Sequence, residues 1–145
     1  MLAMDKHRVA IRALDETRIA ICADMDIVAA RQCGRTLAAE LGFSNTDATL
    51  IATAISELAR NIVIYAKEGE ITLSTLHKSE SCGIVVVAHD NGPGIPDLEQ
   101  AMKMGYSTSG SLGFGLPGVS RLMDEFKIDS RPGHGTTVTI KKWKR

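Results

Sequence analysis

The spacing of apolar side chains along the chain separates strands from helices. Residues 18–23 alternate polar or small with apolar side chains, as a half-buried strand does. The next segment, to about Leu41, places apolar residues at helical spacing, and Asp24 or Asp26 is a candidate for its N-terminal cap. Gly42 fits the position just past the end of this helix. The first periodic segments are therefore a strand and an amphipathic helix.

A second helix is indicated by a capping pattern and a longer apolar stripe. Ser44 stands at the cap position, and the acid Asp47 follows three residues later. The stripe behind them repeats every three or four residues, so we expect it to face the core. Its members are Ile51, Ile55, Leu58, Ile62 and Tyr65.

The second half of the chain is rich in β-prone runs. Residues 70–76 and 82–88 predict two strands joined by a polar hairpin loop. Further along, the pattern predicts a short helix at 97–102, a glycine- and serine-rich loop at 105–113, a helix at 115–126 with Phe126 facing inward, and strands at 127–130 and 136–141. This order predicts an α+β fold, one sheet with helices on a single face, and leaves the strand connectivity open.

Length and charge restrict the classes of protein to which this chain can belong. Its 145 residues suffice for one domain with one core, and its formal net charge of zero gives no global attraction to nucleic acid or an acidic membrane. The basic run 141–145 is interpreted as a solvated chain end rather than a nucleic-acid patch. The longest apolar run, 83–88, is strand-sized, so no membrane-spanning segment is predicted. Three widely spaced cysteines without metal-ligand spacing favour a reducing compartment, and we expect the cytoplasm.

Asp90 is a candidate for recognition of a nucleotide base. It follows the apolar run 85–87 at the exit of a predicted strand, where its carboxylate can accept a hydrogen bond from an exocyclic amine such as that of adenine. Gly92 and Gly94 would let the backbone approach a flat ring, because neither carries a Cβ. Taken alone, the same residues also fit an ordinary turn.

A candidate anion site lies where Gly113 and Gly115 lead directly into a predicted helix with Pro117 in its first turn. Free backbone N–H groups and the positive end of the helix dipole favour an anion there. The alternative is an ordinary junction between a loop and a helix. Neither a P-loop nor a dinucleotide-binding fingerprint is present, so any phosphates would be held by another architecture.

Glu57 and Asn61 are the candidates for catalysis and metal binding. They lie four residues apart in the second helix, so both side chains point from one helix face. An amide oxygen suits Mg²⁺, and a carboxylate one turn earlier could orient or deprotonate a hydroxyl or a water. The alternatives are a helix-surface ion pair of Glu57 with Arg60 and a buried capping role for the Asn61 amide.

Thr136 follows Gly133 and Gly135 at the entry to the last predicted strand. Its hydroxyl could join Asp90 through a water at the nucleotide base. By itself, this segment is indistinguishable from a hairpin turn.

Together these segments resemble those of a known family. Residues 57–61 resemble the N box of the GHKL ATPase superfamily, which includes gyrase, Hsp90-type chaperones, histidine kinases and MutL. Residues 90–94, 113–118 and 133–136 resemble its glycine boxes, in the same order. Within the superfamily the chain is similar to the bacterial serine/threonine kinases that regulate sigma factors, in particular the switch kinases of the stressosome. The stretches that carry this closer resemblance are 26–32, 55–62, 92–97, 113–119 and 121–126.

The resemblance implies a Bergerat fold and a site for ATP. This fold is a two-layer α/β sandwich of the α+β class, whose mixed, mostly antiparallel sheet carries helices on one face. Asp90 would bind the adenine amine, with Gly92, Gly94 and Thr136 beside the base. The phosphates would be lined by Gly113, Gly115 and Gly118, beneath a short lid at about 103–112.

The resemblance also implies the chemistry of a protein kinase. Asn61 would coordinate Mg²⁺, and Glu57 would be the general base for the acceptor hydroxyl. The acceptor would be a serine or threonine on a STAS-domain antagonist or scaffold protein of the stressosome. Once released from that scaffold, such kinases bind and activate a PP2C-type phosphatase or another output protein. No nucleic acid and no membrane are expected as partners.

Two other functions and two departures from the family pattern stay open at this point. The chain could act mainly as a nucleotide-gated anti-sigma or partner-switch protein with little catalysis. A histidine kinase catalytic domain is disfavoured, since the chain has no helical phosphoacceptor domain. Ile62 stands where many superfamily members carry alanine. Residues 1–17 form an extension of unknown role before a kinase domain predicted at 18–145.

Overall fold

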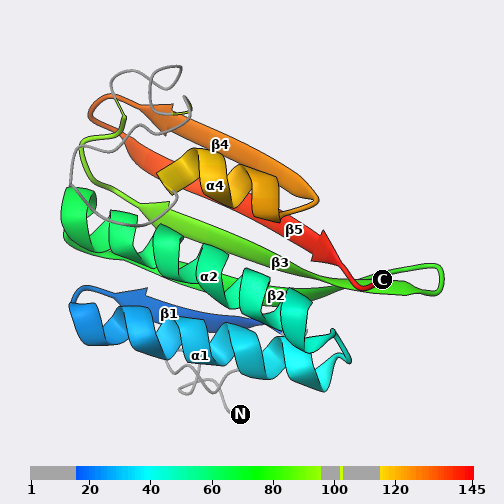
Figure 1. Ribbon diagram of the computed structural model, residues 1–145. Helices are drawn as coiled ribbons and strands as arrows, with labels where there is room; N and C mark the ends of the chain where they lie inside the picture. The colour runs from blue at the N-terminus through cyan, green and yellow to red at the C-terminus, as the bar shows by residue number, and fades with distance from the viewer. Residues whose placement is uncertain (1–15, 96–101, 103–114) are drawn as a thin grey trace, which may run out of the picture.

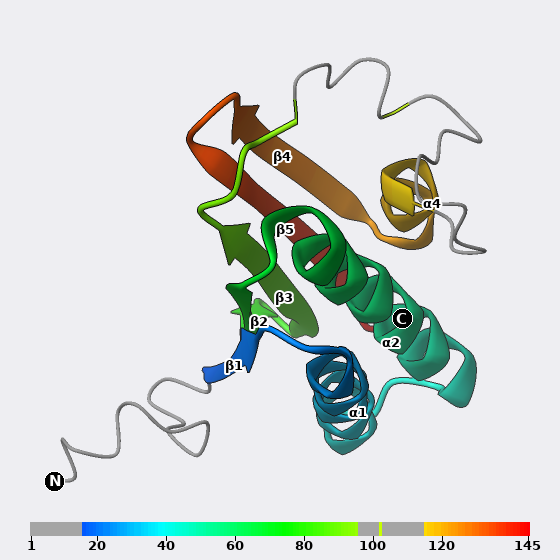
Figure 2. The same cartoon turned by 90° about the vertical axis from the view of Figure 1, so that its left-hand side faces the viewer.

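The computed structural model describes residues 16–95, 102 and 115–145. These residues form two layers, a sheet and a set of helices on one of its faces (Figures 1 and 2). The strands are β1 (Thr17–Ile21), β2 (Gly69–Lys78), β3 (Ser81–Asp90), β4 (Glu125–Arg131) and β5 (Gly135–Trp143). The helices are α1 (Asp24–Glu40), α2 (Asn45–Asn61), its π-helical continuation η3 (Ile62–Ala66) and α4 (Gly115–Leu122). The predicted α+β fold with helices on one face is confirmed.

The strands lie in the order β1-β2-β3-β5-β4, and each neighbouring pair is antiparallel. In the described part of the chain the sheet is therefore antiparallel throughout, where a mixed, mostly antiparallel one was expected. The β4–β5 hairpin joins the sheet through its second strand, which leaves β4 at one edge and β1 at the other. The predicted helix at 97–102 and loop at 105–113 fall, apart from Met102, outside the described residues.

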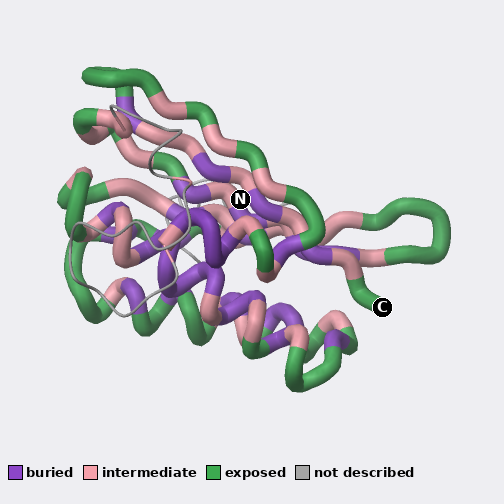
Figure 3. Tube along the Cα trace, turned by 45° about the horizontal axis from the view of Figure 1, so that its top comes forward, coloured by how far each residue is buried: buried purple, intermediate pink, exposed green. Residues whose placement is uncertain are grey.

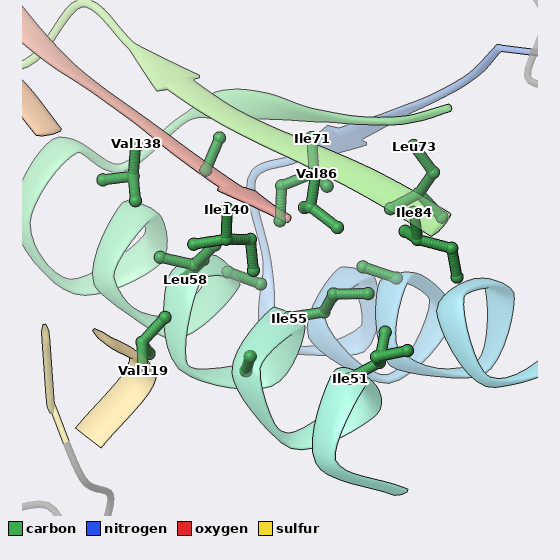
Figure 4. Packing of buried hydrophobic residues seen from close by; sticks show 14 of the residues in the cluster. Ile51, Ile55, Leu58, Ile71, Leu73, Ile84, Val86, Val119, Val138 and Ile140 are labelled. Carbon is green, nitrogen blue, oxygen red and sulfur yellow. The ribbon is translucent and has the colours of Figure 1, made fainter. Parts of the chain in front are cut away.

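The core lies between the sheet and the helices, in rows that cross the strands. Register places Ile71, Ala88 and Val138 in one row, and Leu73, Val86 and Ile140 in the next. Side chains directly opposite one another on antiparallel strands share a face, so both rows point at the helices. The rows pack against side chains of α2 and α4, each at most 2% exposed: Ile51, Ile55, Leu58 and Val119. Figure 4 shows these four beside Ile71, Val138, Leu73, Val86 and Ile140 of the rows.

Helix α2 is the central element of the helical layer. Together with η3 it spans Asn45–Ala66 and is long and apolar enough to cross a membrane by length and composition alone. Here, however, its apolar stripe is buried on the sheet, and Figure 3 shows burial concentrated between the two layers. The same burial explains why the sequence shows such a strong helical period in this segment.

Both long helices begin with a side chain that satisfies free backbone N–H groups. At α2, the Ser44 hydroxyl accepts the Asp47 N–H (3.1 Å), which confirms the predicted cap. At α1, Ala23 is the cap residue, and the Asp26 carboxylate accepts the N–H groups of Cys22 (2.9 Å) and Ala23 (3.0 Å). These hydrogen bonds, the one from Cys22 first, lower the pKa of Asp26 below its usual value of 3.8.

Two predictions of inward-facing residues near helix ends are wrong. Tyr65 was expected on the buried stripe but is 47% exposed, because the wider π-helical turn of η3 carries it off that stripe. Phe126 was expected as the last inward residue of a helix, but α4 ends at Leu122 and Phe126 lies in β4. The chain leaves the helix because Asp124 and the residues after it bond to β5, beginning with the Asp124 N–H on the Lys141 carbonyl (2.9 Å).

The basic C-terminal run is not a solvated chain end. Residues 141–143 belong to β5, and Lys142 is 7% exposed. The Lys142 ammonium donates to the Leu122 carbonyl (3.0 Å) at the end of α4, where a cation is favoured by the helix dipole. Asp124 accepts the Trp143 N–H (2.8 Å) and pairs with Arg145. The run therefore joins the last strand to the last helix.

Candidate active site

The candidate site lies where the core rows end in polar residues. The row that follows Ile71, Ala88 and Val138 contains Gly69, Asp90, Thr136 and Ser130, which are neighbours across β2, β3, β5 and β4. Because this row has the same parity as the core rows, it also faces the helical layer. Asp90 and Thr136, predicted to lie together at a nucleotide base, are direct cross-strand partners.

The Asp90 carboxylate is fixed by the turn that follows it. Its Oδ1 atom accepts the Gly92 N–H (2.8 Å), so the ordinary turn considered for this sequence is present. Gly92 in turn packs on η3, since a Cβ there would lie 2.6 Å from the Ala66 Cβ. This close approach seats the loop after β3 directly on the turn that follows Asn61.

Two more glycines allow backbone contacts that a side chain would block. Gly94 has a φ of +79°, and a Cβ at this position would overlap the Arg131 carbonyl. Gly135 has a φ of +87°, and its Cβ would overlap the Asp90 carbonyl. The Gly133 N–H donates to the Pro93 carbonyl (2.6 Å) between the same two segments. The loop at 92–95 and the β4–β5 hairpin thus form one packed unit beside Asp90.

Ser130 is a site residue that the sequence prediction missed. Its hydroxyl accepts the Ile95 N–H (2.7 Å) and lies 2.7 Å from the Thr136 hydroxyl, so it ties the loop to the hairpin. The available signal was strand alternation, because Phe126, Ile128 and Ser130 share one face and only the last is polar. The boundary assigned to this strand, together with the helix predicted through Phe126, concealed that pattern.

Glu57 is buried on α2, with its carboxylate facing α4. It is 6% exposed, and its Oε2 atom accepts from Arg60 at 2.9 Å. Its Oε1 atom is 3.4 Å from the Gly115 N–H at the first residue of α4, a long and weak hydrogen bond. The alternative ion pair with Arg60 therefore exists, but it covers a buried carboxylate rather than a surface one. A buried carboxylate directed at a helix start is well placed to act on a group bound there.

Asn61 lies one turn after Glu57 and directly before η3. It is half-buried, and its side-chain amide has no hydrogen-bond partner among the described residues. The capping role considered for it is therefore not seen in this part of the chain. A π-helical turn directly after the residue is a feature that sequence periodicity did not predict, and such turns are frequent at functional sites.

The candidate phosphate site is described only in part. Gly115 begins α4 with a φ of +67°, and Gly118 is buried in the first turn together with Pro117. Gly113 and the predicted lid at 103–112 lie outside the described residues. Among the described residues no three His, Cys, Asp or Glu side chains form a metal-binding group. A metal here would therefore depend on the Asn61 amide and on oxygens of a bound phosphate, which is how Mg²⁺ is commonly held.

Proteins of known family resemble this chain in sequence. The family model described as histidine kinase-, DNA gyrase B-, and HSP90-like ATPase matches residues 46–145. Serine/threonine-protein kinase RsbT of Bacillus subtilis is 51% identical over 131 residues, which cover 90% of this chain and 98% of that protein. An anti-sigma F factor of a Thermoanaerobacter species is 32% identical over 118 residues, covering 79% of this chain and 82% of that protein.

Solved structures share the fold at low sequence identity. The RsbU and RsbW domains of a Mycobacterium tuberculosis protein match with a TM-score of 0.59 at 22% identity, over 89% of this chain and 32% of that chain. The SiaB–SiaC complex of Pseudomonas aeruginosa matches with a TM-score of 0.57 at 13% identity, over 99% of this chain and 97% of that chain. At these identities the likeness concerns the fold alone.

Proposed function

We propose that this chain, which belongs to the family of histidine kinase-, DNA gyrase B- and HSP90-like ATPases, is a switch kinase that phosphorylates a STAS-domain protein with Mg-ATP. That the chain is an ATP-dependent serine/threonine-protein kinase follows from its 51% identity, over nearly the full length of both proteins, to a kinase of this type. The observation that carries the proposed site is the position of the buried Glu57 carboxylate against the first N–H of α4.

Asp90 is assigned to the adenine amine. Its Oδ1 atom is held by the Gly92 N–H, and Oδ2 makes no hydrogen bond to another described residue. A carboxylate fixed on one oxygen presents the other in a defined direction, which suits recognition of an exocyclic N–H. Gly92, Gly94 and Thr136 surround it, and Ser130 orients the Thr136 hydroxyl.

Asn61 is assigned to Mg²⁺. Its amide has no described partner and stands one helical turn after Glu57, directly before η3, whose Ala66 packs on Gly92 in the loop after Asp90. A hard oxygen ligand in this place fits a cation that keeps several waters and bridges phosphate oxygens. Bound Mg-ATP would supply the phosphoryl group and neutralise its developing charge.

Glu57 is assigned to the acceptor hydroxyl. It would take the proton from the serine or threonine oxygen as that oxygen forms its bond to the transferred phosphorus and the bond to ADP breaks. Arg60 donates to the Oε2 atom of Glu57 and so fixes the orientation of the carboxylate, whose Oε1 atom faces the start of α4. The N–H groups of Gly115 and Leu116 would bind phosphate oxygens at the start of α4, while Pro117, which follows them, has no N–H.

The partners are proposed from the kind of protein to which the chain is similar. The acceptor would be a STAS-domain antagonist or scaffold protein of a stressosome, and the released kinase would bind an output protein such as a PP2C-type phosphatase. The similarity to an anti-sigma F factor supports a role in partner switching. The site of action would be the cytoplasm.

Transfer of labelled phosphate tests the assignment. The chain is incubated with γ-labelled ATP, Mg²⁺ and a STAS-domain protein encoded beside it, and compared with Glu57→Gln and Asp90→Asn. We expect Glu57→Gln to reduce transfer by about 10²–10⁴-fold with ATP binding retained, as for loss of an acceptor base. Asp90→Asn should lose ATP binding. If the amide oxygen accepts the Gly92 N–H, the amide NH₂ group faces the adenine amine, and two donors cannot hydrogen-bond to each other.

Matched controls are available on carboxylates that lie away from the site. Glu70→Gln lies on the opposite face of the sheet, and Asp24→Asn lies at the start of α1, so both should leave transfer and ATP binding unchanged. If Glu57→Gln transfers phosphate as fast as the unsubstituted chain, Glu57 is not the base. ATP binding without transfer in the unsubstituted chain would favour the second candidate, a nucleotide-gated binding protein, which the anti-sigma similarity supports.

A further inference from the structure

Among the described residues, no strand pairs with the outer edge of β4. In the described part of the sheet β4 is the last strand and bonds only to β5, as Figure 2 shows at the rim of the sheet. An open edge presents unpaired N–H and C=O groups on which another strand can be added.

The hydrogen bonds of the sheet tell which backbone groups face this edge. The Lys144 N–H donates to the Cys82 carbonyl (2.8 Å), so even-numbered residues of β5 point at β3 and odd-numbered ones point at β4. The register Asp129 to Thr137 then directs the odd-numbered residues of β4 at β5. The even-numbered residues of β4 therefore turn their backbone groups to the open edge: Phe126, Ile128 and Ser130.

The side chains between them carry alternating charge. Glu125, Lys127, Asp129 and Arg131 are exposed and lie on the face of the sheet away from the helices. Lys127, Asp129 and Arg131 form no ion pair with another described residue, and Glu125 pairs with Lys141 at 3.5 Å. Along the edge the signs thus run minus, plus, minus, plus.

We propose that two copies of this chain associate through β4, antiparallel about a two-fold axis at Ile128, to form one sheet across both copies. In this register Lys127 stands opposite Asp129 of the second copy and Glu125 stands opposite Arg131, so that every facing pair has opposite charge. The edge backbone groups pair as well, Ile128 with its counterpart and Phe126 with Ser130.

The charge pattern excludes the neighbouring registers. A shift of two residues in either direction places Lys127 against Lys127 or Asp129 against Asp129, and a parallel pairing repeats like charges at every position. A shift of one residue puts the charged side chains opposite the apolar ones. The sequence of β4 is thus complementary to itself in one antiparallel register.

Incompletely buried apolar side chains at the same edge favour the same occupant. Phe126 and Ile128 pack against the core but remain half-exposed on the helix-facing side. A second copy would cover them with its own Ile128 and Phe126. A single strand edge buries less surface than a standard protein interface, so we expect a reversible dimer with a dissociation constant of roughly 10 µM to 1 mM.

Sedimentation equilibrium of the full chain over about 5 µM to 1 mM tests the proposal. The unsubstituted chain should shift from monomer to dimer, and 0.5 M NaCl should weaken the dimer by screening the exposed pairs. Lys127→Glu places like charges at both central pairs and should raise the dissociation constant by at least about tenfold. The double variant Lys127→Glu with Asp129→Lys exchanges the two charges and should restore dimerisation.

The controls separate pairing at β4 from general effects of charge. Lys78→Glu makes the same change of charge at the exposed end of β2 and should leave the dimer intact. Asp129→Lys alone is the second disrupting variant, should Lys127→Glu fail to fold by circular dichroism. A monomer at all concentrations overturns the proposal, and the charged edge then serves only to prevent pairing. The proposal is also overturned if Lys127→Glu leaves the dissociation constant unchanged, or if the double variant with exchanged charges does not dimerise again.

Discussion

Individual residues of the site make close contacts or hydrogen bonds that a different side chain would lose. Gly92 rests on Ala66, and Gly135 rests on the Asp90 carbonyl. Ser130 bridges the Ile95 N–H and the Thr136 hydroxyl, and Arg60 holds the buried Glu57. The contacts of Gly92, Gly135 and Ser130 join segments far apart in the chain, whereas Arg60 and Glu57 lie three residues apart in α2. These contacts position Asp90 and Glu57.

Gly135→Ala tests the close approach at Asp90. The substitution forces an alanine into a φ of +87° and drives its Cβ into the Asp90 carbonyl, so we expect a loss of about 2–4 kcal/mol in the free energy of unfolding. Urea denaturation measures this loss. Gly133→Ala is the matched control, since its φ is +81° but a Cβ there would meet nothing within 4 Å. It should cost only about 1–2 kcal/mol, and an equal cost for both variants would show that the contact is unimportant.

At the scale of elements, helix ends decide where the functional side chains stand. Helix α2 runs into the π-helical η3 immediately after Asn61, and α4 is closed by the Lys142 ammonium. Helix α1 begins where Asp26 accepts two backbone N–H groups. Side chains and termini thus complete the hydrogen bonds that each helix leaves unmade at its ends.

Asp26→Asn should make the start of α1 insensitive to acid. The folded state lowers the pKa of Asp26, so its stabilisation is present above the unfolded pKa of 3.8 and is lost as the pH falls through the lower folded pKa. We expect the variant to be less stable by about 0.3–1 kcal/mol at pH 7, with the difference shrinking as the pH falls below 3.8. Asp24→Asn, in the same first turn, is the control. Urea titrations at several pH values would contradict the assignment if the difference were constant with pH.

At the scale of the whole molecule, the two layers share one core. Rows from all five strands meet the helical layer, and β5 lies between β3 and the edge strand β4. The candidate site is the polar end of these same rows. Its geometry therefore depends on the packing of the entire sheet against α2, rather than on a separate binding loop alone.

Ile140→Ala should destabilise the molecule as one unit. Ile140 is completely buried in β5, so we expect a loss of about 2–5 kcal/mol, whereas Thr139→Ala on the other face should cost less than about 1 kcal/mol. Fluorescence of the single tryptophan, Trp143, and far-UV circular dichroism should report the same transition. Two separated transitions would show that the β4–β5 hairpin unfolds independently of the rest.

The sequence by itself determined the class of fold, the helical face of Glu57 and Asn61, and the position of Asp90 at a strand end. These features follow from periodicity and capping, which depend on residues a few positions apart. It also showed the family resemblance from Arg18 onward, with motifs in the family's order.

Only the tertiary structure decided the features that depend on distant residues. The π-helical turn moved Tyr65 off the core, bonding to β5 ended α4 before Phe126, and the sheet took in the basic C-terminal run. Ser130 became visible as a site residue, and the Glu57 carboxylate as a buried one, only when separate elements were packed together. Local patterns specify propensity and facing, but hydrogen bonds between distant segments decide where each element stops, because buried backbone groups must all find partners.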